Sequence, residues 1–263
     1  MHRLAVIVLL PLSAACTLAQ VTQSTSSSDP LAVSLAQKSV AVLTGGASVS
    51  DVTLSANVIS VLGSGNETGT GTLEAKGTGE SRVDLSLSGG SRSDVRNIAN
   101  GGPAGAWSKN GSAATAYAQH NAWSDAAWFF PASSSLSQTA TPQFVFSYIG
   151  QEQHNGATVQ HISTYQLPPS GLSNSPIARL SAMDFYLDSV SYLPVAVAFN
   201  LHSDTNMGID IPVEIRFANY QLVSGVQVPF HFQRLLNGSL VLDVTVTSAA
   251  INTGLQDSLF TLQ

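Results

Sequence analysis

Cysteine and charged residues are both scarce in this chain of 263 residues. The one cysteine, Cys16, lies in the N-terminal apolar segment, so removal of that segment would leave a chain without disulfides or thiol chemistry. Charged residues make up only 10%, with 10 basic against 16 acidic side chains and a formal net charge of −6. The sequence contains no basic patch, and its net charge is negative, which argues against a nucleic-acid partner. Stability must therefore come from a packed apolar core.

Motifs of the common hydrolases and metalloenzymes are missing as well. The chain has no Gly-x-Ser-x-Gly elbow and no His-Glu-x-x-His pair. His154 and His161 lie on opposite arms of one hairpin but do not supply three metal ligands at a recognisable spacing. Asp184 and Asp188 alternate onto one strand face, where paired carboxylates could cleave a glycoside, but two acids on a solvated strand face are the commoner meaning of this spacing. We therefore predict no cofactor, no metal site and no catalytic residue.

Residues 1–19 have the form of a secretory signal peptide. Arg3 precedes an apolar run, which is too short for a stable membrane span, and the segment ends in Thr17-Leu18-Ala19. We predict cleavage after Ala19, export to the periplasm or the medium, and a Ser/Thr-rich linker over residues 20–29. An alternative stays open, because Ser13-Ala14-Ala15-Cys16 is a weak lipoprotein signal. A lipid on Cys16 would anchor the chain to a membrane.

Residues 30–263 are predicted to form one domain, mainly β with a few helices. Asp29 can cap a helix that starts at Pro30 and ends before Gly45-Gly46. Beyond it, apolar and polar residues alternate, as in an antiparallel sheet with one covered face. Asn-Gly turns at Asn110, Asn155 and Asn237 predict tight hairpins. The expected strand pairs are 106–109 with 113–118, 144–152 with 158–166, 183–187 with 194–202, and 226–236 with 240–247, with a further strand at 211–217. Residues 120–130 and, more weakly, 175–182 are expected to be short helices.

Two stretches carry a family resemblance. Residues 183–199 place Asp188 five residues before Leu193-Pro194, and residues 220–262 contain Gly225-Val-Gln-Val-Pro229 ahead of a hairpin and Asn252-x-Gly-Leu. Together they resemble the LolA/LolB-like superfamily of outer-membrane lipoprotein-sorting proteins. The resemblance implies a bacterial, Gram-negative origin and a strongly curved antiparallel meander sheet. This unclosed half-barrel would have helices on its concave side and an apolar cavity for acyl chains. No arginine here can be matched to the carriers' functional arginine.

We therefore expect an exported protein that binds or carries a hydrophobic ligand, either a lipid or a lipoprotein acyl chain, with membrane or lipoprotein contact. The residues expected to line its cavity are apolar side chains on the inward strand faces and on the covering helix: Phe199, Val228, Phe230, Leu242, Val244, Trp123 and Phe130. The spacing of Trp123 and Phe130 equally fits the buried stripe of a packed helix.

Two alternative functions remain. One is a structural or protein-binding component of the cell envelope. The other is an envelope hydrolase that uses His202, Asp204 or His231. Oligomeric state does not follow from the sequence.

Overall fold

The computed structural model describes residues 27–63, 65–169 and 175–261. The predicted signal peptide, its cleavage site after Ala19, the alternative lipidation site at Cys16 and most of the linker lie outside the described residues. No helix within the described ranges is long and apolar enough to cross a membrane.

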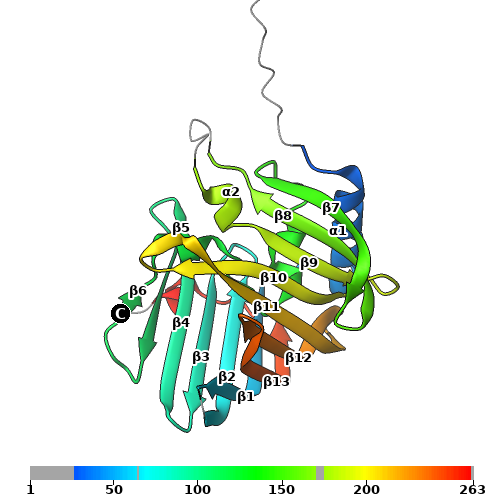
Figure 1. The fold of residues 1–263 in the computed structure, drawn as a ribbon. Coiled ribbons are helices and arrows are strands. Elements are labelled where there is room, and N and C mark those ends of the chain that lie inside the picture. The colour runs from blue at the N-terminus through cyan, green and yellow to red at the C-terminus, as the bar shows by residue number, and fades with distance from the viewer. Residues whose placement is uncertain (1–26, 64, 170–174, 262–263) are drawn as a thin grey trace, which may run out of the picture.

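The strands form a single antiparallel sheet in the order β6-β5-β4-β3-β2-β1-β13-β12-β11-β10-β9-β8-β7 (Figure 1). Their bounds are β1 Asp51–Leu62, β2 Gly65–Lys76, β3 Ser81–Leu87, β4 Gly90–Ala99, β5 Gly102–Lys109, β6 Thr115–Ala116, β7 Phe144–His154, β8 Ala157–Gln166, β9 Met183–Asp188, β10 Pro194–Ser203, β11 Asn206–Val223, β12 Val226–Leu236 and β13 Ser239–Ile251. The helices are α1 Pro30–Thr44 and α2 Ile177–Leu180, with single 3-10 turns η1 Gln119–Trp123, η2 Pro131–Ser133, η3 Ser135–Ser137 and η4 Asp257–Phe260.

The sheet is strongly curved but not closed, since the edge strands β6 and β7 lie at opposite ends of the strand order. Register shifts interrupt five strand pairs, and bulges of this kind bend a strand and increase its twist. They fall at Ser55/Ala56, Tyr148/Gly150, Pro194/Ala196, His202/Ser203 and Arg234/Leu235. The predicted fold class, a curved antiparallel half-barrel, is confirmed.

Helix α1 begins and ends where its capping residues predict. The Asp29 carboxylate accepts the backbone N–H of Leu31 at 2.8 Å, and Gly45 ends the helix in the left-handed region at φ 58°. A side chain at Gly45 would also meet the carbonyl oxygen of Gly225, 2.7 Å from the position of its Cβ. Fully buried Ala32, Ala36 and Leu43 place α1 in the same core as the sheet.

The predicted helix over residues 120–130 is wrong beyond its first turn. η1 ends at Trp123, Ser124 is extended, and Asp125 bonds to Ser135 instead of continuing a helix. The helical spacing of the aromatic residues in this segment therefore does not reflect a helix. Strand β4 had no sequence prediction, because Val95 is its only buried side chain among polar neighbours. The strand predicted at 211–217 is the middle of the much longer β11.

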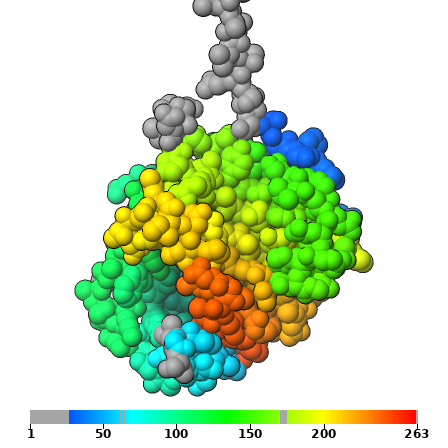
Figure 2. Space-filling model, in the orientation of Figure 1, coloured from blue at the N-terminus to red at the C-terminus, as the bar shows by residue number. Residues whose placement is uncertain are grey.

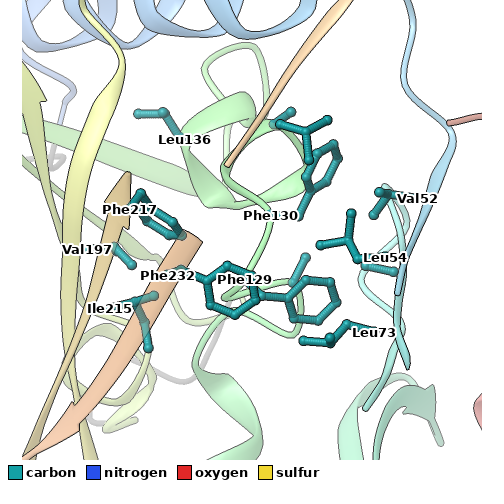
Figure 3. Packing of buried hydrophobic residues seen from close by; sticks show 14 of the residues in the cluster. Val52, Leu54, Leu73, Phe129, Phe130, Leu136, Val197, Ile215, Phe217 and Phe232 are labelled. Carbon is teal, nitrogen blue, oxygen red and sulfur yellow. The ribbon is translucent and has the colours of Figure 1, made fainter. Parts of the chain in front are cut away.

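The core lies on the concave side of the sheet, and Phe129 and Phe130 are its centre. Both are wholly buried. Figure 3 shows them between Val52, Leu54 and Leu73 on one side and residues of β10 to β12 on the other, among them Phe217 and Phe232. The connection between β6 and β7 thus fills the upper part of the half-barrel with its own side chains.

Candidate ligand-binding site

The chain between η1 and η3, residues 119–138, crosses the concave face and is called the crossing segment below. Asn121 fixes one end of it. Its Nδ2 donates to the carbonyl oxygen of His202 at 2.8 Å, and its Oδ1 accepts the backbone N–H of His202 at 2.7 Å. Arg96 on β4 donates through Nη1 to the Asn121 carbonyl at 2.9 Å. The crossing segment is therefore tied to both walls of the half-barrel.

Below the crossing segment the concave face is not filled. A cavity of about 400 Å³, called the lower cavity, lies between β3–β5 and β12–β13. Its apolar lining consists of Val83, Leu85, Trp107, Trp128 and Leu242. Figure 2 shows a hollow at this place, between the green strands β4–β5 and the orange β12–β13 hairpin, beneath the yellow β10–β11 hairpin. Its size is within the range of small-molecule pockets.

A second cavity of about 240 Å³, called the inner cavity, continues from the first and shares Asp94, Trp107, Trp128 and Arg234 with it. Its remaining lining mixes polar and apolar groups: Arg96, Tyr117, Asn121, Ser124, Phe199, Leu201, His202, Asp204, Ile211 and Leu236. The two cavities together form a site with an apolar end and a polar end.

Arg234 stands at the junction of the two cavities. Its guanidinium carbon lies 5.0 Å from the centre of the Trp128 ring, within the range of a cation–π contact. Burial lowers the pKa of Arg234, while Asp94 nearby acts in the opposite direction. Directly across the β12–β13 pairing lies Leu242, so a charged and an apolar side chain sit side by side on the cavity wall.

The structure separates the residues that the sequence analysis grouped as cavity lining. Leu242 lines the lower cavity and Phe199 lines the inner cavity. Phe130, Val228 and Val244 are wholly buried in the packed core, and half-buried Phe230 packs against that core. The seventh, Trp123, lines a third cavity of about 260 Å³ on the other side of the crossing segment.

This third, upper cavity is polar and contains Asp125. The Asp125 carboxylate accepts hydrogen bonds from the Ser135 backbone N–H at 3.0 Å and the Ser135 hydroxyl at 2.9 Å. Burial nevertheless raises the pKa of Asp125 to about 6, well above its ordinary value of 3.8. At a pH between 3.8 and about 6, the native protein therefore keeps a proton on Asp125 that the unfolded chain has already released.

Asp125→Asn is expected to stabilise the protein at pH 7.5 by on the order of 2 kcal/mol and to leave it unchanged at pH 4. The raised native pKa contributes stability below the unfolded pKa, and this contribution is lost as the pH rises through about 6. Asparagine stays neutral and retains an acceptor for both Ser135 bonds. Urea unfolding at the two pH values measures the difference.

Asp188→Asn serves as the control of opposite sign. Hydrogen bonds from Ser191, of which the backbone bond is the strongest, lower the pKa of Asp188. Its ionised form therefore stabilises the native state at pH 7.5 and loses that effect in acid. An Asp125→Asn variant that follows the Asp188→Asn trend would contradict the assignment.

The histidines do not form a joint catalytic or metal site. His202 and Asp204 both line the inner cavity, but His231 is on the opposite face of β12, with its Nε2 3.0 Å from Asp243. His154 and His161 both lie beside the Tyr186 ring, at ring-centre distances of 3.7 and 4.5 Å. Among the described residues, no three His, Cys, Asp or Glu side chains are arranged to hold a metal ion.

The sequence analysis missed Arg234, although a local signal for it existed. Val226, Val228, Phe230 and Phe232 alternate onto the inward face of β12, and Arg234 is the next position of the same parity. A basic residue continuing an inward apolar row marks a buried charge. Asp94 had no such signal, because it lies on β4, which was not predicted; its partner Trp107 is part of the strand predicted at 106–109.

Comparison with solved structures identifies the fold as LolA-like. A putative outer membrane lipoprotein-sorting protein domain from Vibrio parahaemolyticus matches with a TM-score of 0.54 and 12% identity, covering 88% of this chain and 96% of that one. A DUF1329 family protein from Desulfovibrio piger gives 0.55 and 11%, covering 89% and 98%. A LolA superfamily protein from Nitrosomonas europaea gives 0.50 and 11%, covering 88% and 97%. No family model and no curated protein sequence matches this chain. The resemblance drawn from residues 183–199 and 220–262 is confirmed at the level of the fold.

Proposed function

We propose that this protein binds and carries a hydrophobic ligand, a lipid or a lipoprotein acyl chain, in the lower cavity. The observation that carries the proposal is the unfilled apolar lining of Val83, Leu85, Trp107, Trp128 and Leu242, which lies on the concave face beside the packed core. Each methylene moved from water into such a lining contributes roughly 0.8 kcal/mol, so binding needs no catalytic group.

The roles proposed for the residues follow their positions. Leu242 touches the ligand in the lower cavity, and Phe199 meets it where it enters the inner cavity. The core behind the cavity wall supports it through the side chains of Phe130, Val228, Phe230 and Val244. Trp123 belongs to the part of the crossing segment that closes the site above. The LolA-like fold supports this assignment, because a putative outer membrane lipoprotein-sorting domain shares it.

The setting proposed for this activity is the periplasm or cell envelope. Residues 1–19 would direct export, with cleavage after Ala19, and lipidation of Cys16 would instead leave the protein tethered to a membrane. In either case the ligand would come from, or be delivered to, a membrane or a lipoprotein.

Mass spectrometry of the full chain expressed in a Gram-negative host and purified without detergent tests the proposal. We expect an acyl-containing ligand at a stoichiometry near one, and binding of the neutral dye N-phenyl-1-naphthylamine after delipidation. The same spectrum shows whether the mature chain starts at Gln20 or at a modified Cys16. A folded protein that carries no lipid and does not bind the dye would overturn the proposal.

A further inference from the structure

Arg234 is a cation without an ionic partner at the meeting point of the two cavities. Among the described residues it takes part in no salt bridge and donates no side-chain hydrogen bond, and its one specific contact is with the face of Trp128. A buried charge is costly unless it is paired and hydrogen-bonded. Arg234 is half-buried, and its guanidinium faces the cavities without such a partner among the described residues.

The neighbouring charged groups are already engaged with each other. Asp94, the acidic residue that lines both cavities, accepts a hydrogen bond from the Tyr117 hydroxyl. Arg96 lies 4.8 Å from the centre of the Tyr117 ring and donates to the Asn121 carbonyl. At the outer end Arg92 pairs with Glu67. Lys109 also lines the lower cavity but is exposed, so among the described residues Arg234 is the half-buried lining cation whose donors remain to be used.

The charge of the site differs from that of the whole chain. The chain carries a formal net charge of −6, yet the two cavities are lined by four cationic side chains, Arg92, Arg96, Lys109 and Arg234, against Asp94 and Asp204. Burial lowers the pKa of His202, which also lines the inner cavity, so this residue adds no charge at neutral pH. A positively lined pocket in an acidic protein favours an anion at that place.

We propose that the ligand is an amphiphile with an anionic head group, whose carboxylate or phosphate pairs with Arg234 while its acyl chain lies in the lower cavity. The planar guanidinium fork matches both anions and forms two parallel hydrogen bonds with either. Because Leu242 lies directly opposite Arg234 on β13, the head and the first methylenes fit one continuous wall. This inference rests on the proposed function and names the chemical class of its ligand.

Displacement of N-phenyl-1-naphthylamine from the delipidated full-length protein tests the inference. The competitors share a 12-carbon chain and differ only in the head: laurate, dodecyl phosphate and dodecanol. We expect one or both anions to bind roughly 10- to 100-fold more tightly than dodecanol, as a charge-assisted hydrogen bond implies. Preference for laurate would point to a fatty acid, and preference for dodecyl phosphate to a phospholipid.

Arg234→Met should remove this preference. The variant is expected to bind both anions about as weakly as it binds dodecanol. Arg216→Met is the matched control, since Arg216 is on the outer face of β11 in a pair with Glu214 and touches neither cavity. It should leave all affinities and the preference unchanged. Arg234→Lys, which retains the charge but not the fork, should retain part of the preference.

Failure of this inference can be told from failure of the proposed function. Equal affinity for laurate, dodecyl phosphate and dodecanol in the original protein would overturn the anionic head while leaving a hydrophobic site in place. A preference that survives in Arg234→Met would overturn the role of Arg234. If the dye and all three competitors fail to bind, the proposed function itself is wrong. The head-group comparison in the original protein needs no variant, so it decides the question even if Arg234→Met does not fold.

Discussion

Replacing Leu85 by tryptophan should weaken binding of N-phenyl-1-naphthylamine and dodecanol by about tenfold or more. Leu85 lines the lower cavity from β3, where it lies opposite Gly71 on β2 and Arg92 on β4. A larger side chain at this position occupies the space that we assign to the ligand, and overlap with a bulky group costs about 1–3 kcal/mol. Dye titration and the lipid content after purification both measure the loss.

The neighbouring residue provides a matched control. Ser86 follows Leu85 on the same strand, but it is exposed and faces away from the cavity. Ser86→Trp adds the same indole to the outer surface and should leave dye binding and lipid content unchanged. If Leu85→Trp, folded as judged by its circular dichroism, binds like the original protein, then the ligand does not occupy the lower cavity.

Phe130→Ala is expected to lower the free energy of unfolding by about 3–5 kcal/mol, which is the usual effect of removing a buried phenyl ring. Phe130 has no exposed surface and packs between the two walls of the half-barrel (Figure 3). Its loss would leave a hole in the core between these two walls. Urea unfolding followed by circular dichroism gives the difference.

Leu222→Ala is a suitable control for this experiment. Leu222 lies on β11 and is 67% exposed, so its truncation should change the free energy of unfolding by no more than about 0.5 kcal/mol. A Phe130→Ala variant that keeps its stability but no longer binds the dye would contradict the structural role of Phe130 and favour direct contact with the ligand.

Sequence patterns correctly predicted the elements that depend only on residues close together in the chain. Helix α1 was expected between Asp29 and Gly45 because capping requires only neighbouring residues. The hairpins at Asn155 and Asn237 were expected because a two-residue turn fixes the pairing of both strands, and β7–β8 and β12–β13 form as predicted. The order of these elements was sufficient to indicate the LolA-like fold.

Predictions failed where contacts distant in the sequence decide the structure. The crossing segment has helical spacing of Trp123 and Phe130, but hydrogen bonds from Asn121 to His202 and from Ser135 to Asp125 hold it in an irregular path. Strand β4 forms because β3 and β5 pair with it on either side, although its own sequence is largely polar. Pairing with neighbours can thus outweigh weak strand propensity.

The sequence by itself determined the class of this protein: a chain without a usable disulfide, with alternating strands and tight turns, whose inward faces are apolar. It also determined which face of each predicted strand is buried, since that follows from a period of two. Only the tertiary structure decided which buried residues are core and which line a cavity. Val244 and Leu242 are two apart on one face of β13, yet one is sealed in the core and the other borders open space. The difference arises because the crossing segment fills the upper part of the half-barrel and leaves the lower cavity open beside Arg234 and its apolar neighbours.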